Sequence, residues 1–320
     1  MKKIKSNLSP LLGLVLTIIL TIIFIREPSF PTPDKVVIFV FFFCMIFRQA
    51  MFVLKRLLPF ILILLTYDSF RGIADQLNTN VNYSFPPSID RWLFGELPTV
   101  SLQSWLWHGH VRWYDFALYL PYLLHFVLPI GLAILIWQTK QSYYWRYVVT
   151  FTVVSFAAFF TFLLFPAAPP WLASDNGHIE PVTRISSDVW HSLGLTDFPS
   201  VYNHISPNPV AAVPSLHAAW AILVSIFVFR YYGRKWGALS ALYPLVIFFG
   251  TVYQGEHYFI DVVLGVLYAI GAYLISPYIV RLLKKPALHI WSRHTRGRSQ
   301  AAKAARIRLN HSSNTRSACR

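Results

Sequence analysis

The chain has 320 residues, of which 55% are hydrophobic, 17% aromatic and only 13% charged. Soluble domains carry about twice this charged fraction, so the composition excludes an ordinary soluble enzyme and predicts a polytopic membrane protein. The formal net charge is +15, and the only two cysteines, Cys44 and Cys319, are too far apart in such a chain to suggest a disulfide or a cysteine metal site.

Apolar runs along the sequence predict the membrane topology. Eight of them are long enough, or nearly so, to cross a bilayer, which requires about 20 apolar residues. The second run is the weakest because Arg48 interrupts it. We therefore expect an all-α bundle of about eight transmembrane helices. The runs comprise residues 9–25, 36–54, 57–74, 116–137, 146–165, 214–231, 237–252 and 258–280.

The distribution of charge predicts the orientation. With the N-terminus in the cytoplasm, most of the 28 Lys and Arg residues fall on the cytoplasmic side, and all 13 acidic residues fall on the opposite side. Both termini are therefore predicted to be cytoplasmic. Residues 282–320 are basic and contain no acidic residue, which is typical of a disordered cytosolic tail attracted to anionic lipid headgroups. We expect no nucleic-acid partner.

The third apolar run ends in two ionisable residues, Asp68 and Arg71. Charged groups at membrane depth are costly and usually face a polar cavity, so both are candidates for substrate binding. The planar guanidinium of Arg71 can bind two phosphate oxygens at once. The alternative is a structural ion pair that joins two helices.

A long polar loop follows the fifth run and extends to Val213. It contains Arg184, a second candidate for holding a phosphate group. Its histidines are thirteen residues apart, at His178, His191 and His204, and form no short pair of the kind that binds metals. No metal site is predicted.

Two histidines open the sixth and eighth apolar runs. Pro214-Ser215-Leu216-His217 precedes one, and Gly255-Glu256-His257-Tyr258-Phe259-Ile260-Asp261 leads into the other. His257 and Asp261 are four residues apart, so on a helix the carboxylate can hold one imidazole nitrogen. Two such histidines suit phosphoryl transfer, in which one attacks phosphorus and the other protonates the leaving oxygen. Alternatively, each is an ordinary polar residue at a membrane boundary.

These two stretches resemble the second and third signature motifs of the type 2 phosphatidic acid phosphatase superfamily. The sequence Gly-Glu-His-Tyr and the segments 68–72 and 165–171 look closest to its inositol phosphorylceramide synthase-like branch. The resemblance implies a six-helix catalytic core in residues 57–281, behind two N-terminal spans in residues 1–56. It also implies that His257 is the nucleophile, Asp261 its orienting partner and His217 the general acid, without a metal. We further expect Ser215 to bind the substrate and no cofactor to be needed.

The sequence departs from the superfamily at two places. Thr251 stands where most members have an Arg six residues before the nucleophile, and Leu64 with Arg71-Gly72 occupies the spacing of a missing Lys and Arg-Pro motif. Arg71 and Arg184 are the candidates to hold the phosphate instead.

Three functions follow from these observations. The first is a membrane phosphotransferase that moves a phospho-headgroup or phosphoryl group between a lipid donor and another alcohol, such as a polyol, on the non-cytoplasmic face. The second is a lipid phosphate phosphatase acting on phosphatidic acid or a prenyl diphosphate, which would share the phosphohistidine intermediate. The third is a non-catalytic membrane protein with a degenerate site.

Overall fold

The computed structural model describes residues 2–26, 33–125, 127–194 and 208–283, and every named element in them is a helix. The all-α prediction is therefore confirmed. The long helices are α1 (Lys2–Arg26), α2 (Pro33–Ile46), α3 (Ala50–Leu77), α6 (Trp113–Leu123), α7 (Val127–Thr139), α8 (Tyr144–Leu164), α12 (Leu216–Tyr232), α14 (Leu242–Tyr253) and a last helix, Phe259–Leu283. Short helices connect them: α4 (Phe85–Phe94), α5 (Pro98–Leu106), η1 (Gln141–Tyr143), α9 (Pro170–Asp175), α10 (Ile185–Ser192) and α13 (Arg234–Ser240).

Five helical segments within the described residues are long and apolar enough to cross a membrane, and a bent pair raises the number to six. An integral multi-pass membrane protein is therefore the architecture that length and composition support. The sequence predicted about eight spans. The five segments are Ser9–Arg26, Leu57–Leu77, Gln141–Leu164, Arg234–Tyr253 and Phe259–Leu283.

The second predicted span, residues 36–54, is not one helix. α2 ends at Ile46 and α3 begins at Ala50, with Arg48 between them at a φ of 61°. A left-handed backbone at a non-glycine residue breaks the helical hydrogen-bond ladder, so the interruption that Arg48 signalled in the sequence divides the run.

The remaining differences concern two further runs. Residues 116–137 form the bent pair α6 and α7, whose axes differ by 48°. α12 corresponds to the run 214–231 but has only 17 residues, short of a full bilayer crossing. Pro121 lies inside α6 two residues before that helix ends, where its ring removes a backbone donor.

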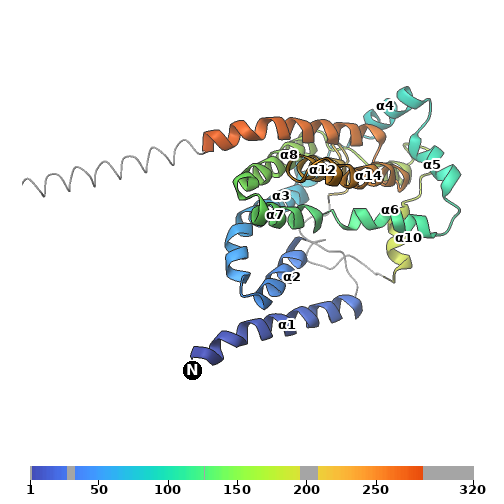
Figure 1. Cartoon of the computed structure of the whole chain (residues 1–320). Coiled ribbons are helices and arrows are strands. Elements are labelled where there is room, and N and C mark those ends of the chain that lie inside the picture. Colours follow the sequence, from blue (N-terminus) through green and yellow to red (C-terminus); the bar gives the residue numbers. More distant parts are fainter. Residues whose placement is uncertain (1, 27–32, 126, 195–207, 284–320) are drawn as a thin grey trace, which may run out of the picture. The chain divides into compact units, whose positions relative to one another are not determined.

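Aromatic side chains from several helices form the centre of the bundle. Phe60 of α3 meets Tyr147 and Phe151 of α8, which in turn contact Trp220 and Phe227 of α12. Each of these rings is at most 1% exposed. Such rings bury large apolar areas, and α3, α8, α12 and α14 are accordingly packed together (Figure 1).

Short helices and loops gather over one end of this bundle. Asn82, Ala167 and Ala211 come from three separate loops and join by isolated backbone bridges. The buried Gln103 of α5 adds a link, because its amide group donates to the carbonyls of Thr183 and Tyr253, at 2.8 and 2.9 Å. These bonds satisfy a loop carbonyl and a carbonyl at the C-terminal end of α14, and they hold the loops in place.

Two parts of the sequence-based organisation stay predictions. The division into residues 1–56, 57–281 and 282–320 is one, and α3 runs across the first of these boundaries. Almost all of the predicted basic tail, residues 284–320, lies outside the described part of the chain.

Candidate active site

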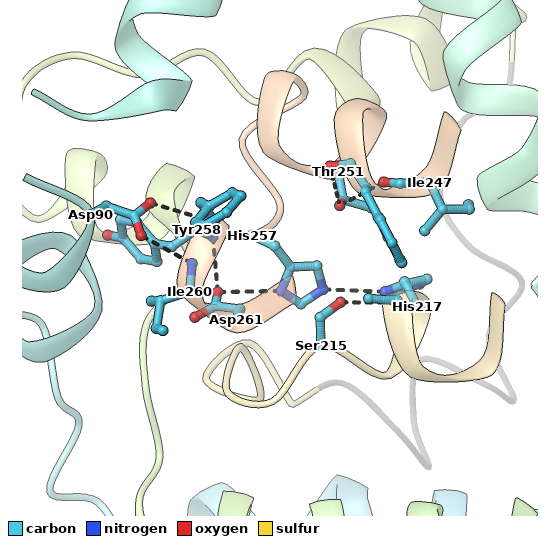
Figure 2. Close-up of polar contacts among 12 residues, drawn as sticks. Asp90, Ser215, His217, Ile247, Thr251, His257, Tyr258, Ile260 and Asp261 are labelled. Carbon is cyan, nitrogen blue, oxygen red and sulfur yellow. Dashed lines mark hydrogen bonds and ion pairs between the residues drawn. The ribbon is translucent and has the colours of Figure 1, made fainter. Parts of the chain in front are cut away.

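His217 and His257 lie side by side, although they are forty residues apart in the sequence. The distance between Nδ1 of His217 and Nε2 of His257 is 3.3 Å (Figure 2). His217 is in the first turn of α12, and His257 lies two residues before the last helix. The end of α14 and the starts of these two helices thus bring the two predicted catalytic histidines together.

Asp261 faces the other nitrogen of His257. Its Oδ2 lies 3.4 Å from Nδ1 of His257 and accepts the backbone N–H of Tyr258 at 2.9 Å. The first distance is that of an ion pair and is long for a hydrogen bond, as is common in catalytic sites without substrate. A proton on Nδ1 facing the carboxylate leaves the Nε2 lone pair of His257 directed at His217.

The Ser215 loop ties the two histidine segments together. Ser215 caps α12, because its hydroxyl oxygen accepts the N–H of Ala218 at 3.3 Å, and its own N–H donates to the carbonyl of Asp261 at 2.9 Å. A Cβ on Gly265 would overlap the carbonyl oxygen of Ser215. Only a glycine therefore lets the last helix approach this loop so closely. Ser215 is fully buried, its observed contacts are those of a cap, and a substrate contact stays a prediction.

Aromatic rings fix the plane of His217. Tyr122 stacks on it with ring centroids 4.3 Å apart, and His125 meets it at 4.4 Å with the two ring planes tilted by 46°. His125 in turn stacks on Trp220 at 4.6 Å, and the indole N–H of Trp220 donates to Ser155. Tyr122 is in the last turn of α6, and His125 lies in the break between α6 and α7. Sequence reasoning missed both, because they lie within an apolar run whose bend only the structure shows.

Arg184 lies beside the nucleophile loop, paired with Glu256. Its Nε and one terminal nitrogen are 2.8 and 3.4 Å from the two carboxylate oxygens of Glu256, and its guanidinium lies over the ring of Trp171 at 4.2 Å. Ser186 also donates to Glu256. Burial raises the pKa of Glu256, but the charge and hydrogen bonds of Arg184 outweigh it, so the pKa is below its usual value. The pair is therefore ionised at neutral pH.

Arg184 keeps a large exposed fraction in this arrangement, with 44% of its side chain accessible. It also interacts electrostatically with Tyr122, the residue that stacks on His217. Arg184 thus interacts with one neighbour of each histidine, Tyr122 beside His217 and Glu256 next to His257, and Glu256 fixes its orientation. Glu256 was not singled out by the sequence, although it immediately precedes His257.

Arg71 is part of the same region and Asp68 is only partly described. Arg71 lies near the end of α3, interacts electrostatically with His217 and His125, and accepts a hydrogen bond at its carbonyl from Asn208 at 2.9 Å. The backbone of Asp68 is in α3, but its side chain lies outside the described residues. Roles in phosphate binding stay predictions for both.

Thr251 occupies the position where the superfamily resemblance led us to look for an arginine. Its hydroxyl donates to the carbonyl of Ile247 at 2.8 Å, within its own helix. Its carbonyl accepts the N–H groups of Glu256 and His257, at 3.0 and 3.1 Å, with Gly255 making the turn at a φ of 81°. Thr251 therefore supports the nucleophile loop by its backbone. Within the described residues, no group of three or more His, Cys, Asp or Glu side chains could hold a metal ion.

This arrangement of two facing histidines and a carboxylate, at one end of a membrane helix bundle, defines a class of protein. The PAP2 superfamily matches residues 88–275, which is more than half of the chain and includes both histidine motifs. The chain belongs to this superfamily, which confirms the family predicted from the sequence.

Three relatives indicate which branch of the superfamily this chain resembles. The phosphoinositol dihydroceramide synthase of Bacteroides thetaiotaomicron is 28% identical over 235 residues, which cover 69% of this chain and 76% of the relative. The inositol phosphorylceramide synthase catalytic subunit aur1 of Schizosaccharomyces pombe is 32% identical over 120 residues, 36% of this chain and 28% of the relative. The inositol phosphorylceramide synthase of Candida albicans is 25% identical over 51% of this chain and 36% of the relative. No solved structure matches the chain significantly.

The predicted similarity to inositol phosphorylceramide synthases is thus confirmed. The chain is a membrane enzyme of the PAP2 superfamily and is similar to this branch of lipid phosphotransferases.

Proposed function

We propose that this protein transfers an inositol phosphate headgroup from a phospholipid to the primary hydroxyl of a ceramide or dihydroceramide, through a phosphohistidine on His257. The names of the relatives supply the headgroup and the acceptor. The observation that supports the chemistry is the 3.3 Å contact between Nδ1 of His217 and Nε2 of His257, with Asp261 behind the second ring.

The first half of the reaction breaks the bond between phosphorus and the diglyceride oxygen. Nε2 of His257 attacks phosphorus and forms a P–N bond, and His217 donates its proton to the departing oxygen. In-line displacement places the entering nitrogen and the leaving oxygen on opposite sides of phosphorus. The two rings therefore have to separate when the phosphate group enters between them.

The second half transfers the headgroup to the lipid alcohol. His217, now neutral, removes the proton of the ceramide hydroxyl, whose oxygen attacks phosphorus and breaks the P–N bond. Asp261 stabilises the positive charge that His257 carries during this cycle. Water in place of ceramide gives hydrolysis by the same steps, so exclusion of water from the intermediate would decide the outcome.

Arg184 and Arg71 are the proposed holders of the phosphate oxygens. Both are close enough to the histidine pair to interact with it or with its stacked tyrosine, and a guanidinium offers the paired donors that phosphate requires. Glu256 keeps Arg184 oriented by its two short contacts. These residues would replace the arginine whose position Thr251 occupies.

A transfer assay with purified full-length protein tests the proposal. Mixed micelles would contain radiolabelled phosphatidylinositol and dihydroceramide, with readout of the new inositol phospholipid, of free inositol phosphate and of acid-labile label on the protein. We expect a ceramide-dependent product and a trapped phosphohistidine. His257→Ala should abolish both, with a loss on the order of 10⁴-fold or more.

His178→Ala is the matched control, because His178 lies outside the catalytic group and stacks on Tyr83. It should retain activity. Release of free inositol phosphate without any ceramide product would identify a hydrolase instead. Full activity in His257→Ala would refute the nucleophile assignment.

A further inference from the structure

Asp90, a buried carboxylate on α4, contacts the helix that carries Asp261. Its side chain is 0% exposed, and its two oxygens accept the backbone N–H groups of Phe259 and Ile260, at 2.8 and 3.0 Å (Figure 2). These are the first two residues of the last helix, two and three positions after His257. Asp90 is thus 169 residues away in sequence from the nearer N–H group that it binds.

The start of a helix exposes N–H groups that have no partner within the helix. Here Asp261 takes the N–H of Tyr258, and Asp90 takes the next two. Capping by a side chain normally comes from a neighbouring residue, as Ser215 does for α12. In the last helix a carboxylate from a different element performs this function and holds the segment that contains His257 and Asp261.

α4 is itself fixed against the same helix. The rings of Phe94 and Phe259 meet edge to face with centroids 4.9 Å apart. Arg91 of α4 also pairs with Glu180 of a loop at 2.6 Å, but this pair is exposed and adds little. The carboxylate of Asp90 therefore belongs to a firmly placed element. A shift of α4 would move the start of the helix and, with it, the contact between Asp261 and His257.

Burial makes the ionised form of Asp90 unfavourable. Burial raises the pKa of Asp90 to about 6, the two N–H bonds partly oppose this, and Asp261 raises it further. Because the folded-state pKa is raised, Asp90 contributes most to folding stability below pH 3.8, where the carboxyl is protonated in both the folded and the unfolded chain. This contribution is lost as the pH rises through about 6 and the buried group becomes charged. At neutral pH the buried carboxylate therefore lowers stability, which is common for groups kept for function.

We propose that Asp90 is a positioning residue for the transfer reaction: by binding the N–H groups of Phe259 and Ile260, it fixes the start of the last helix and so aims His257 at phosphorus. This inference rests on the proposed role of His257 as nucleophile. Asp90 does not touch the reacting atoms and acts through the helix. An asparagine at this place carries no charge and puts an NH2 donor where one of the two carboxylate oxygens now accepts an N–H group.

The test compares wild type, Asp90→Asn, Asp90→Ala and Glu180→Gln as full-length proteins in the transfer assay. Glu180 is the matched control, since it is a carboxylate that contacts α4 at its surface and lies outside the helix start. We expect Asp90→Asn to lower kcat about ten- to hundredfold, because small misplacements of reacting groups have effects of this size. KM should change less than about twofold, and phosphohistidine formation should slow in proportion. Asp90→Ala should be slower still, and Glu180→Gln unchanged.

A pH profile separates positioning from a purely structural role. The titratable groups that interact electrostatically with Asp90 are Asp261 and Tyr258, at the start of the last helix. Arg91 and Glu180 in turn interact electrostatically with Tyr258. The ratio of wild-type to Asp90→Asn activity should rise with pH through about 6 and then level off. Thermal unfolding and gel filtration, measured in parallel, give the folded fraction.

Three results would overturn the inference. Equal kcat per folded molecule in wild type and Asp90→Asn would show that the cap is dispensable. An activity ratio that does not vary with pH, together with a loss of folded protein, would show that Asp90 only supports the fold. A wild type that forms neither product nor phosphohistidine would refute the proposed function, and this inference with it.

Discussion

The contact between His257 and Asp261 carries the first prediction at the scale of single residues. Asp261→Asn should lower the transfer rate by about 10²- to 10⁴-fold, because a neutral amide does not stabilise the positive charge that His257 carries during the reaction. The amide oxygen can still accept the N–H of Tyr258, so the fold should persist. Rates of phosphohistidine formation and thermal unfolding curves check this, and an unchanged rate would remove Asp261 from the catalytic group.

Arg184 carries a second prediction at this scale. Arg184→Lys preserves the charge but replaces a planar fork by a single ammonium, so the KM for the phospholipid donor should rise roughly tenfold or more, with a smaller change in kcat. Glu256→Gln should have the same direction and a smaller size, because Arg184 then lacks its charged partner.

Arg91→Lys is the control for this pair of variants. Arg91 makes a comparable contact with Glu180, but both side chains are substantially exposed, at 38% and 51%. Exposed pairs contribute little, so the kinetics of Arg91→Lys should match wild type. If Arg184→Lys also binds the donor like wild type, Arg184 is not a phosphate ligand.

The close approach of the Ser215 loop and the last helix gives a prediction at the scale of structural elements. Gly265→Ala places a Cβ in overlap with the carbonyl oxygen of Ser215 and within 3.3 Å of Ala218. The start of α12 must then move away, and His217 moves with it. We expect a clear loss of transfer activity and a lower melting temperature.

Gly271→Ala is the matched control in the same helix. A Cβ at Gly271 meets no atom within 4 Å, so alanine should be tolerated and should raise stability by up to about 1 kcal/mol through its helix propensity. Comparable activity losses in both variants would indicate that the contact with Ser215 is not the reason that glycine is needed.

At the scale of the whole molecule, the candidate active-site residues come from the end of α3, the break between α6 and α7, the start of α12 and the start of the last helix. The charge pattern of the sequence predicts that this end of the bundle faces away from the cytoplasm. The reaction would then take place at the non-cytoplasmic leaflet.

Cysteine labelling tests this orientation. In a Cys44→Ala background, Ser192→Cys adds an exposed thiol on α10, beside the active-site loops, while Cys319 marks the C-terminus. A membrane-impermeant maleimide should label the new cysteine in intact cells and should label Cys319 only after permeabilisation. The opposite pattern would place the active site in the cytoplasm.

The sequence predicted the parts of the site that follow from local spacing. His257 and Asp261 are four residues apart, and the i to i+4 geometry alone brings their side chains to one face. Ser215 and His217 were found because a capping residue and a histidine directly precede an apolar run. The class of fold was predictable too, since burying so many apolar residues with so few charges requires a membrane.

Only the tertiary structure decided the contacts between distant segments. Asp90, Glu256 and His125 gained their partners by packing, and no periodicity in the sequence relates Asp90 to Phe259, 169 residues away. The bend between α6 and α7 likewise depends on local backbone geometry that hydropathy does not record, whereas Arg48 already marked the weak point at which residues 36–54 divide. Hydrophobic pattern and short-range spacing thus determined the membrane class and the two histidine motifs. The supporting groups were decided by the fold, because a hydrogen bond depends on which surfaces meet in space.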